Sequence, residues 1–370
     1  MTQTSRVAQW GMLALAVFCA LTIDIAGITR SVVKSDHYVG DFTVFWTAAR
    51  SSPDIIYDTD AISHAQAPLI GGDKGPRPFL NPPSFLPWLA PFARLPFLAA
   101  LAVWNGLGLL ALGLAAKRLL SWREIAIAAV APPLVLAFAA GQVTLFVSAV
   151  SIAALLNLRT RPLLAGALLG LAATIKPQAV LLAPLALMAG RHWRALAAAA
   201  IVGAAIGAAC VALQGPSLWL SWFRALSGFG EISQRFYLMR RGATPANLAY
   251  LMSLSGPAKT ALVTGGAVLG LVLVWVTFRG TQDVKLRLGA LVAGSILCLT
   301  YAMPYEAAPL LIPATGMLLD PRRPLLWFVG FLMISQLILP IAVIAMAAAI
   351  LWLVLKDQSP RVAEGSAPRS

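Results

Sequence analysis

The chain has 370 residues and a formal net charge of +14; 59% of its residues are hydrophobic and 11% are charged. A mean hydropathy of +0.80 excludes a water-soluble globular domain, because so few polar residues cannot cover so much apolar surface. The basic residues stand in twos and threes between apolar runs, which argues against a nucleic-acid partner. The composition therefore predicts an all-α polytopic membrane protein.

The first apolar run, at residues 10–29, is expected to be the first transmembrane segment. It continues through Asp24 without a small-residue cleavage pattern, so we expect an uncleaved anchor rather than a removed signal peptide. Three cysteines lie far apart inside predicted spans and lack the spacing of metal ligands, so disulfides and zinc are not expected. These cysteines are Cys19, Cys210 and Cys298.

Together with the first run, the later apolar runs predict about twelve transmembrane segments, some of them short, in a single domain over residues 1–356. The later runs occupy 84–116, 122–140, 142–158, 162–176, 178–190, 194–213, 257–279, 287–303, 306–319, 324–337 and 339–356. The run at 84–116 is too long for one span, and its prolines predict a broken first half. These prolines are Pro87, Pro91 and Pro96. Residues 357–370 are expected to form a disordered cytoplasmic tail.

Basic residues in the short connections set the expected orientation, since Lys and Arg are enriched on the cytoplasmic side of membrane proteins. They are Arg6, Lys117, Arg118, Arg123, Arg159, Arg161, Arg191, Arg194, Arg279, Lys285, Arg287, Arg322, Arg323 and Lys356. This pattern predicts cytoplasmic N- and C-termini in a plasma or inner membrane, with loops 30–82 and 214–256 outside. Of the 14 carboxylates, eight fall outside and six of those lie in the first loop. We therefore expect loop 30–82 to be the catalytic loop.

The first loop is expected to contain two short amphipathic helices, at 41–50 and 59–69, followed by a Gly- and Pro-rich stretch at 71–78. Helices with aromatic faces of this kind tend to lie in the plane of the membrane interface. The sequence thus predicts interfacial helices on the extracytoplasmic side of the bundle.

Several short motifs follow one another in a fixed order along the chain. They are Tyr38-Val-Gly-Asp41-Phe-Thr-Val-Phe-Trp-Thr-Ala-Ala49, Ile56-Tyr-Asp58, Phe79-Leu-Asn-Pro-Pro83, Gly141-Gln-Val-Thr-Leu145, Ala172-Ala-Thr-Ile-Lys176-Pro-Gln178 and Arg191-His-Trp-Arg194. In this order they resemble glycosyltransferase family 87, whose members are membrane transferases of the GT-C fold. Weaker similarity continues through residues 241–248 and 300–306. The chain departs from the family at Asn81, where tyrosine is more frequent before the two prolines.

The resemblance implies a GT-C-type helical bundle that moves a sugar, by default mannose, from a polyprenyl monophosphate to an envelope glycolipid or polysaccharide. Transfer with inversion needs one base for the acceptor hydroxyl and cations for the leaving phosphate. Asp41 fits the base, because it stands at the start of a helix near the membrane surface. The alternative is that its carboxylate only caps that helix.

Three basic residues are the candidates for binding the donor phosphate. Lys176 ends an apolar helix immediately before a proline, where a charge is costly unless it is paired or faces a polar cavity. Its alternative is to extend to the membrane interface. Arg240 and Arg241 make the second outside loop basic, which suits a lid over an anionic donor or a face that binds lipid headgroups.

Four further residues are expected to bind the sugar or other substrate groups. Gln142 lies in a tight turn and binds substrate or satisfies the backbone of that turn. Tyr305 and Glu306 are candidate sugar ligands, although a Pro-Tyr-Glu helix start would also explain them. Asp58 completes the set. Its spacing to Asp60 suits a metal, but a lipid monophosphate donor needs less help to leave, so no obligatory metal or other cofactor is expected.

Two other functions remain open at this point. A lipid-linked sugar transporter or flippase also has many spans, but alternating access favours pseudosymmetric halves with polar groups near the middle of the membrane. Here the halves differ, and the polar residues gather on one face. The chain can also be a non-catalytic subunit of an envelope-assembly machine. The expected partners are membrane lipids, the lipid-linked sugar and its acceptor, and not nucleic acid.

Overall fold

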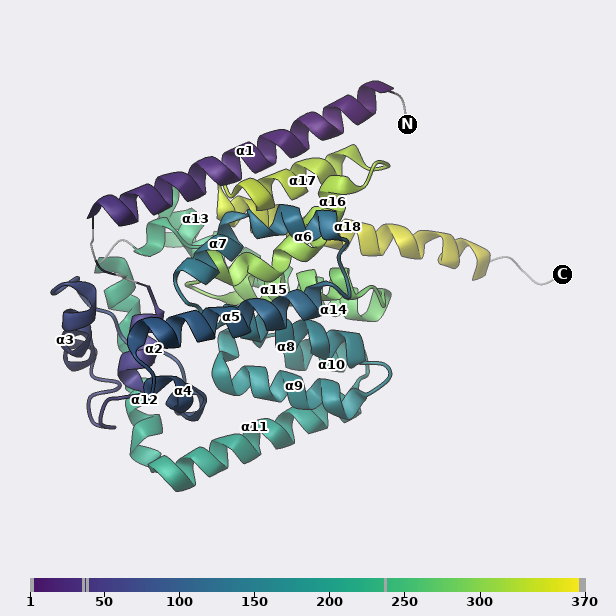
Figure 1. Cartoon of the computed structure of the whole chain (residues 1–370). Coiled ribbons are helices and arrows are strands. Elements are labelled where there is room, and N and C mark those ends of the chain that lie inside the picture. Colours follow the sequence, from purple (N-terminus) through teal and green to yellow (C-terminus); the bar gives the residue numbers. More distant parts are fainter. Residues whose placement is uncertain (1–2, 35–36, 38–39, 236–237, 366–370) are drawn as a thin grey trace.

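A computed structural model of the chain describes residues 3–34, 37, 40–235 and 238–365, and this part contains helices and turns but no strand (Figure 1). The first half contains α1 (Gln3–Lys34), α2 (Phe42–Ala48), α3 (Thr59–Ile70), the 3-10 helix η1 (Pro83–Phe85), α4 (Leu86–Ala93), α5 (Phe97–Ala116), α6 (Trp122–Ala129), α7 (Pro132–Ala139), α8 (Thr144–Asn157), α9 (Pro162–Ile175) and η2 (Pro177–Val180). The second half contains α10 (Ala183–Ala189), α11 (Trp193–Gln214), α12 (Pro216–Arg235), η3 (Leu238–Arg240), α13 (Pro245–Leu251), α14 (Gly256–Gly280), α15 (Val284–Cys298), η4 (Pro304–Leu310), α16 (Leu311–Leu319), α17 (Pro324–Ser335) and α18 (Leu339–Gly365). The prediction of an all-α protein is confirmed for the described residues.

Fewer helices are long enough to cross a membrane than the sequence predicts. Among the described residues, five helices are long and apolar enough to cross a membrane: Arg6–Gly27 within α1, α5, α11, α14 and Leu339–Asp357 within α18. The α6–α7 pair, bent by 64°, makes a sixth if it is one span. The predicted count of about twelve is therefore not confirmed.

Short helices account for the difference. Each predicted apolar run does form helix, but α8 and α9 have 14 residues each and α17 has 12. At a rise of about 1.5 Å per residue, 14 residues reach about 21 Å, which is less than the roughly 30 Å of a bilayer core. Proline ends several of these runs, as at Pro177 after α9 and at Pro96 between α4 and α5. The predicted break in the run 84–116 is therefore present.

Glycine allows some of these helices to pack closely. α9 and α11 lie side by side (Figure 1), and a Cβ atom at Gly166 would stand 2.1 Å from the carbonyl oxygen of Ala195. At Gly170, one turn later, the carbonyl oxygen of Ala199 would be 2.5 Å away. Only glycine permits this approach, so the two ends of α9 are held in fixed positions relative to α11.

The first loop folds onto the bundle through aromatic side chains. The predicted helices at 41–50 and 59–69 are present as α2 and α3; their place in the membrane interface stays a prediction. Phe42 and Phe45 of α2 are buried and lie with ring centroids 5.6 Å and 6.2 Å from that of Trp104 in α5. The amide of Phe42 donates to the carbonyl of Ala140, 2.9 Å away. The start of α2 is thereby held against the turn between α7 and α8.

A second part of the same loop is attached to the end of α9. The amide nitrogen of Asn81 donates to the carbonyl of Ile175 at 3.0 Å, and the hydroxyl of Ser84 donates to the carbonyl of Thr174 at 2.6 Å. These carbonyls lie in the last turn of α9, where the helix leaves them without partners of its own. Asn81, where the chain departs from the family pattern, therefore binds the backbone of Ile175, the residue before Lys176.

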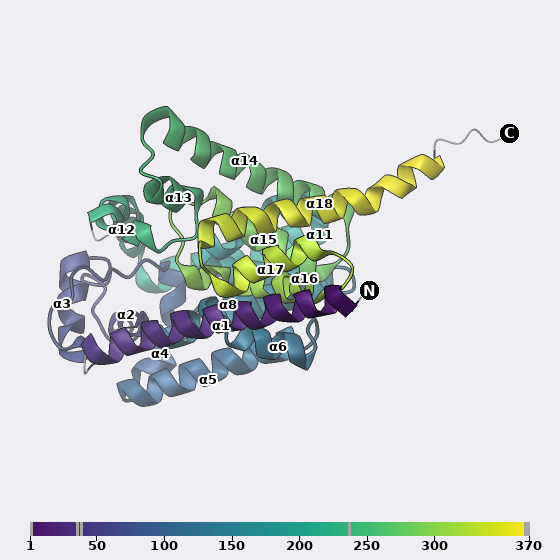
Figure 2. The same cartoon turned by 90° about the horizontal axis from the view of Figure 1, so that it is seen from above.

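The first helix lies along the outside of the bundle, whereas most of the last helix is packed inside it: Ala342, Met346 and Ile350 of α18 are fully buried. α1 packs against α17, and the last turns of α18 extend past the other helices (Figure 2). The helix α18 reaches Gly365, so it enters the segment predicted to be a disordered tail. The remaining tail residues, 366–370, lie outside the described residues.

Candidate active site

Four distant parts of the chain bring polar side chains together at one end of the bundle. Asp41 precedes α2, Gln142 lies in the turn between α7 and α8, Lys176 follows α9, and η4 begins with Tyr305 and Glu306 close behind its proline. Their hydrogen bonds form one connected network, which we call the Asp41 cluster. Five of the eight residues predicted to form the site thus meet in space.

The turn that carries Gln142 depends on its glycine. Gly141 has φ of 62°, in the left-handed region that glycine adopts without cost. The amides of Gly141 and Gln142 donate to the carbonyls of Phe138 and Ala137, which closes the end of α7. The backbone of the turn is satisfied by these bonds, so the Gln142 side chain is left for other partners.

The carboxylate of Asp41 does not cap its helix. The residue has helical dihedral angles, φ −70° and ψ −20°, and its side chain makes no capping bond. Instead, Oδ2 accepts hydrogen bonds from Nε2 of Gln142 and from the hydroxyl of Tyr305, the latter at 3.0 Å. Among the described residues, no group donates to Oδ1. One oxygen is therefore fixed by two donors, and the other has no donor among the described residues.

The amide of Gln142 has only one possible orientation in this network. Its Oε1 accepts from the Lys176 ammonium at 3.1 Å, and its Nε2 faces the Asp41 carboxylate. A lysine can only donate and a carboxylate can only accept, so exchanging the amide oxygen and nitrogen would lose both bonds. Gln142 thus links Lys176 to Asp41, so the position of the Asp41 carboxylate depends on that of the Lys176 ammonium.

Lys176 is buried and fully bonded. Its side chain is 5% exposed, and Nζ lies 2.6 Å from Oε1 of Glu306, 2.8 Å from the hydroxyl of Thr144 and 3.1 Å from Gln142. These partners use all three N–H donors of an ammonium group. The Tyr305 ring is a further contact, with its centroid 5.1 Å from Nζ. An incoming anion therefore has to replace one of the present partners.

Tyr305 serves as a permanent donor to Asp41. Burial of the phenol and the nearby carboxylates of Asp41 and Glu306 raise its pKa well above the usual value of 10. All of these effects disfavour the phenolate. The hydroxyl consequently keeps its proton, and its bond to Oδ2, throughout the neutral range.

The other three predicted site residues lie elsewhere. The carboxylate of Asp58 caps α3, where its Oδ1 accepts from the amides of Asp60 at 3.0 Å and Ala61 at 2.9 Å. It is exposed and outside the Asp41 cluster. Arg240 and Arg241 are also exposed, at the end of η3, which packs on α12 and α13. In the described part of the chain, no three His, Cys, Asp or Glu residues are placed to hold a metal ion.

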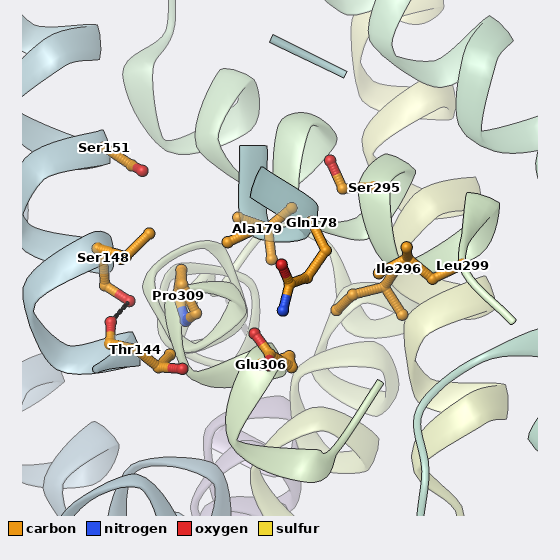
Figure 3. A pocket seen from close by; sticks show the side chains of 12 residues that line it. Thr144, Ser148, Ser151, Gln178, Ala179, Ser295, Ile296, Leu299, Glu306 and Pro309 are labelled. Atoms are coloured by element: carbon orange, nitrogen blue, oxygen red, sulfur yellow. Dashed lines mark hydrogen bonds between the residues drawn. The ribbon is translucent and has the colours of Figure 1, made fainter. Parts of the chain in front are cut away.

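A pocket beside the Asp41 cluster contains polar residues that were not predicted from the sequence. Thr144, Ser148 and Ser151 line it from α8, and Ile296 of α15 and Leu299, just after that helix, line the opposite side (Figure 3). The three hydroxyl residues are spaced i, i+4 and i+7, which places them on one face of an otherwise apolar helix. This spacing was the signal available in the sequence.

Two residues from different elements meet in this pocket. Gln178 of η2 and Glu306 of η4 point toward one another across it (Figure 3). Thr144 and Glu306 line the pocket and also bind Lys176, so the pocket adjoins the Asp41 cluster directly. Together the two features place hydroxyl, amide and carboxylate groups beside a buried cation.

Comparison with protein families gives one match. The model of glycosyltransferase family 87 matches residues 79–300, which is more than half of the chain. The matched range contains Gln142, Lys176 and Gln178, whereas Asp41 and Glu306 lie outside it. No curated protein and no solved structure matches the chain.

Proposed function

The chain belongs to glycosyltransferase family 87 and is therefore a membrane glycosyltransferase; we propose that its donor is a polyprenyl-monophosphate sugar. The sugar is a hexose, with mannose as the first choice, and the acceptor is an envelope glycolipid or polysaccharide. The observation that carries this proposal is the Asp41 carboxylate, with Oδ2 held by two donors and Oδ1 without a donor from the described residues.

In the proposed reaction Asp41 is the general base. The acceptor hydroxyl oxygen attacks the anomeric carbon, and the bond between that carbon and the phosphate oxygen breaks. The hydroxyl proton passes to Oδ1, while the bonding electrons leave with the polyprenyl phosphate. Direct displacement inverts the anomeric configuration. A base held in one orientation is suited to this step, because proton transfer requires hydrogen-bond geometry at the moment of reaction.

Lys176 is proposed to bind the donor phosphate in exchange for Glu306. Its bond to Gln142 orients Asp41, so the ion pair with Glu306 is the partner whose replacement leaves the base in place. The leaving phosphate gains negative charge, and a buried ammonium stabilises that charge more strongly than an exposed one does. Arg240 and Arg241, on the surface loop, would cover the phosphate from outside.

Thr144, Ser148 and Gln178, which line the small pocket beside Lys176, are proposed to contact the transferred sugar after the pocket has opened, because its volume of about 20 Å³ holds little more than a water molecule. The hydroxyl and amide groups of these residues are neutral donors and acceptors of the kind that sugar hydroxyls require. Glu306, once released from Lys176, would accept hydrogen bonds from the same sugar. Asp58 is given no substrate contact in this proposal, since its carboxylate caps α3.

The arginine-rich turns support an extracytoplasmic active site. Arg159 and Arg161 precede α9, and Lys176 follows it, so these arginines and the Asp41 cluster lie at opposite ends of one helix. If the arginine end is cytoplasmic, as the enrichment of Lys and Arg there suggests, Asp41 faces the outside of the plasma or inner membrane. Labelling of single cysteines placed at 161 and 73 with an impermeant reagent tests this orientation.

The function is tested with purified protein in lipid nanodiscs. Wild type is incubated with radiolabelled polyprenyl-phosphate sugars and envelope lipids, and the product is identified; Asp41→Asn is the blank and Asp58→Asn the matched control from the same loop. We expect glycoside from wild type and Asp58→Asn, and little from Asp41→Asn. Movement of a lipid-linked sugar without glycoside formation would indicate a flippase instead. A chain inert with every donor would fit a non-catalytic subunit.

A further inference from the structure

A hollow rich in arginine lies at the other end of α9. It is lined by Arg159 from the turn between α8 and α9, and by Arg191, His192, Trp193 and Arg194 from the turn between α10 and α11. Because α9 has 14 residues, this hollow is about 20 Å from Lys176. It is therefore separate from the Asp41 cluster and the adjoining pocket.

Helix packing holds the two turns together. Gly166 and Gly170 let α9 approach α11 so closely that the start of α9 lies beside the start of α11. In the second turn Arg191 has φ of 56°, a left-handed conformation that is uncommon for any residue but glycine. The amides of Arg191 and His192 donate to the carbonyls of Met188 and Leu187, which keeps the turn in this shape. These two bonds form the Schellman motif that commonly ends a helix, and here they fix the direction in which the chain carries Arg191 and Arg194.

Within the described part of the chain, the positive charge in this hollow has no acidic partner. Among the described residues, carboxylates pair only with Lys176, Lys285 and Arg323. Arg287 adds a further cation, because its guanidinium lies 3.4 Å from Nε2 of His192. Burial, then the charges of Arg287 and Arg159, lower the pKa of His192. The cations thus repel one another, and a bound anion would relieve the repulsion.

The surroundings of the hollow are apolar. Trp193 is 59% exposed and Leu163 is 62% exposed, and both stand at helix starts next to the arginines. Exposed tryptophan is typical of the membrane interface. A soluble anion would use the arginines alone, whereas a lipid would place its phosphate on them and its acyl chains along Leu163 and the outer face of α11.

We propose that this hollow binds the phosphate group of an anionic phospholipid in the membrane leaflet opposite the active site. Guanidinium groups bind phosphate oxygens in pairs of parallel hydrogen bonds, and basic pockets between helices are known to hold lipid headgroups. Arg159 and Arg194 make the phosphate contacts, and the lipid joins the two turns at the base of α9 and α11.

The proposal is tested by lipid binding to the full chain in detergent. Wild type, R159Q/R194Q and the matched control R322Q/R323Q are titrated with phosphatidylglycerol, with phosphatidylcholine and with inorganic phosphate, and bound lipid is counted by native mass spectrometry. The control removes two charges from the turn before α17, where Asp320 pairs with Arg323. Far-UV circular dichroism and elution volume show that each variant is folded.

We expect wild type and R322Q/R323Q to bind phosphatidylglycerol at least tenfold more tightly than R159Q/R194Q does, and to prefer it over phosphatidylcholine. Equal retention by R159Q/R194Q and wild type would overturn the proposal. Displacement of the lipid by millimolar inorganic phosphate would overturn the lipid assignment, because it would identify a soluble anion as the ligand. Neither readout depends on sugar transfer.

Discussion

Two lysine–glutamate ion pairs connect helices in the described part of the chain, and they differ in what surrounds them. Lys285 and Glu124 lie 2.9 Å apart, and Glu124 also completes a capping box with Ser121 at the start of α6. Lys176 and Glu306 lie 2.6 Å apart, and neither caps a helix; their remaining contacts lead to Asp41 and to the polar pocket. The first pair is therefore explained by its structural role, which is to hold the start of α6 against α15.

The second pair carries a cost that the first does not. The Lys176 side chain is 5% exposed and that of Lys285 is 30% exposed. Burying a charge costs several kcal/mol even when it is paired, and hydrophobic residues of similar size often replace such a pair without loss of stability. Stability alone therefore does not explain this ion pair, and the proposed role of Lys176 in phosphate binding does.

Replacing each lysine by methionine gives the largest expected contrast. Lys176→Met leaves Glu306 buried without a cation and removes the donor that orients Gln142. We expect sugar transfer to fall at least about 100-fold and the free energy of unfolding to fall by about 3–5 kcal/mol. Lys285→Met should retain transfer and lose about 1 kcal/mol, since this pair is partly exposed. Transfer assays and chemical denaturation measure the two effects.

The double variant K176M/E306Q separates stability from function. It removes the unpaired charge, so we expect stability to recover while transfer stays low. Recovery of transfer together with stability would show that the pair is only structural.

Gln142→Ala should produce the next largest effect. It removes one of the two donors to Asp41 Oδ2, and hydrogen bonds to charged groups contribute about 1.5–3 kcal/mol, so we expect kcat to fall roughly 10- to 100-fold. The KM for the lipid donor should change less, because Lys176 keeps its bond to Thr144 and can still exchange Glu306 for the donor phosphate. Steady-state kinetics in nanodiscs provides both constants. A rise in KM with unchanged kcat would assign Gln142 to substrate binding instead.

Tyr305→Phe should lower kcat by about tenfold, since it removes the second donor to Oδ2 and keeps the ring over Lys176. The phenol pKa is raised in the folded protein, so the stabilisation from its neutral form is fully present below pH 10 and is lost only at higher pH. Wild type should therefore show no loss of rate from this group between pH 6 and pH 10. A step in that range that disappears in Tyr305→Phe would show that the phenol ionises.

Asn81→Ala tests the smallest effect. The side chain donates to the Ile175 carbonyl next to Lys176, and a neutral hydrogen bond of this kind contributes about 1 kcal/mol. We expect a stability loss of that size and a decrease of a few-fold in kcat, both measured as above. A decrease in kcat much larger than a few-fold, with a stability loss of only about 1 kcal/mol, would mean that Asn81 also contacts substrate.

The sequence predicted much of the fold because hydrophobic runs and proline breaks are local signals. The helices α2 and α3, the break before α5 and the turn at Gly141 follow directly from residue type and spacing. The lengths of α8 and α9 were also visible, because the predicted runs 142–158 and 162–176 match them within two residues. Apolar runs do not reveal which of these short helices cross the membrane, because that depends on packing among neighbouring helices, which is not a local property.

The residues of the site were easier to predict from the sequence than the hydrogen bonds that connect them. Asp41 and Lys176 stood out as charges beside apolar helices, but the bridge through Gln142 joins residues about 100 and 34 positions apart. Asp58 and Asp41 look alike in sequence, each at a helix start, and only the three-dimensional arrangement separates a capping carboxylate from one held by Gln142 and Tyr305. The hydroxyl stripe of α8 was visible but resembled ordinary helix packing.

The most direct test of Asp41 as the base is a single-turnover measurement. Asp41→Asn, Asp58→Asn and wild type are loaded with radiolabelled lipid-linked sugar, freed of excess donor and mixed with acceptor lipid. The account predicts that all three retain the donor, and that transfer by Asp41→Asn is about 100- to 10,000-fold slower than by the other two. Transfer by Asp41→Asn at the wild-type rate would contradict it.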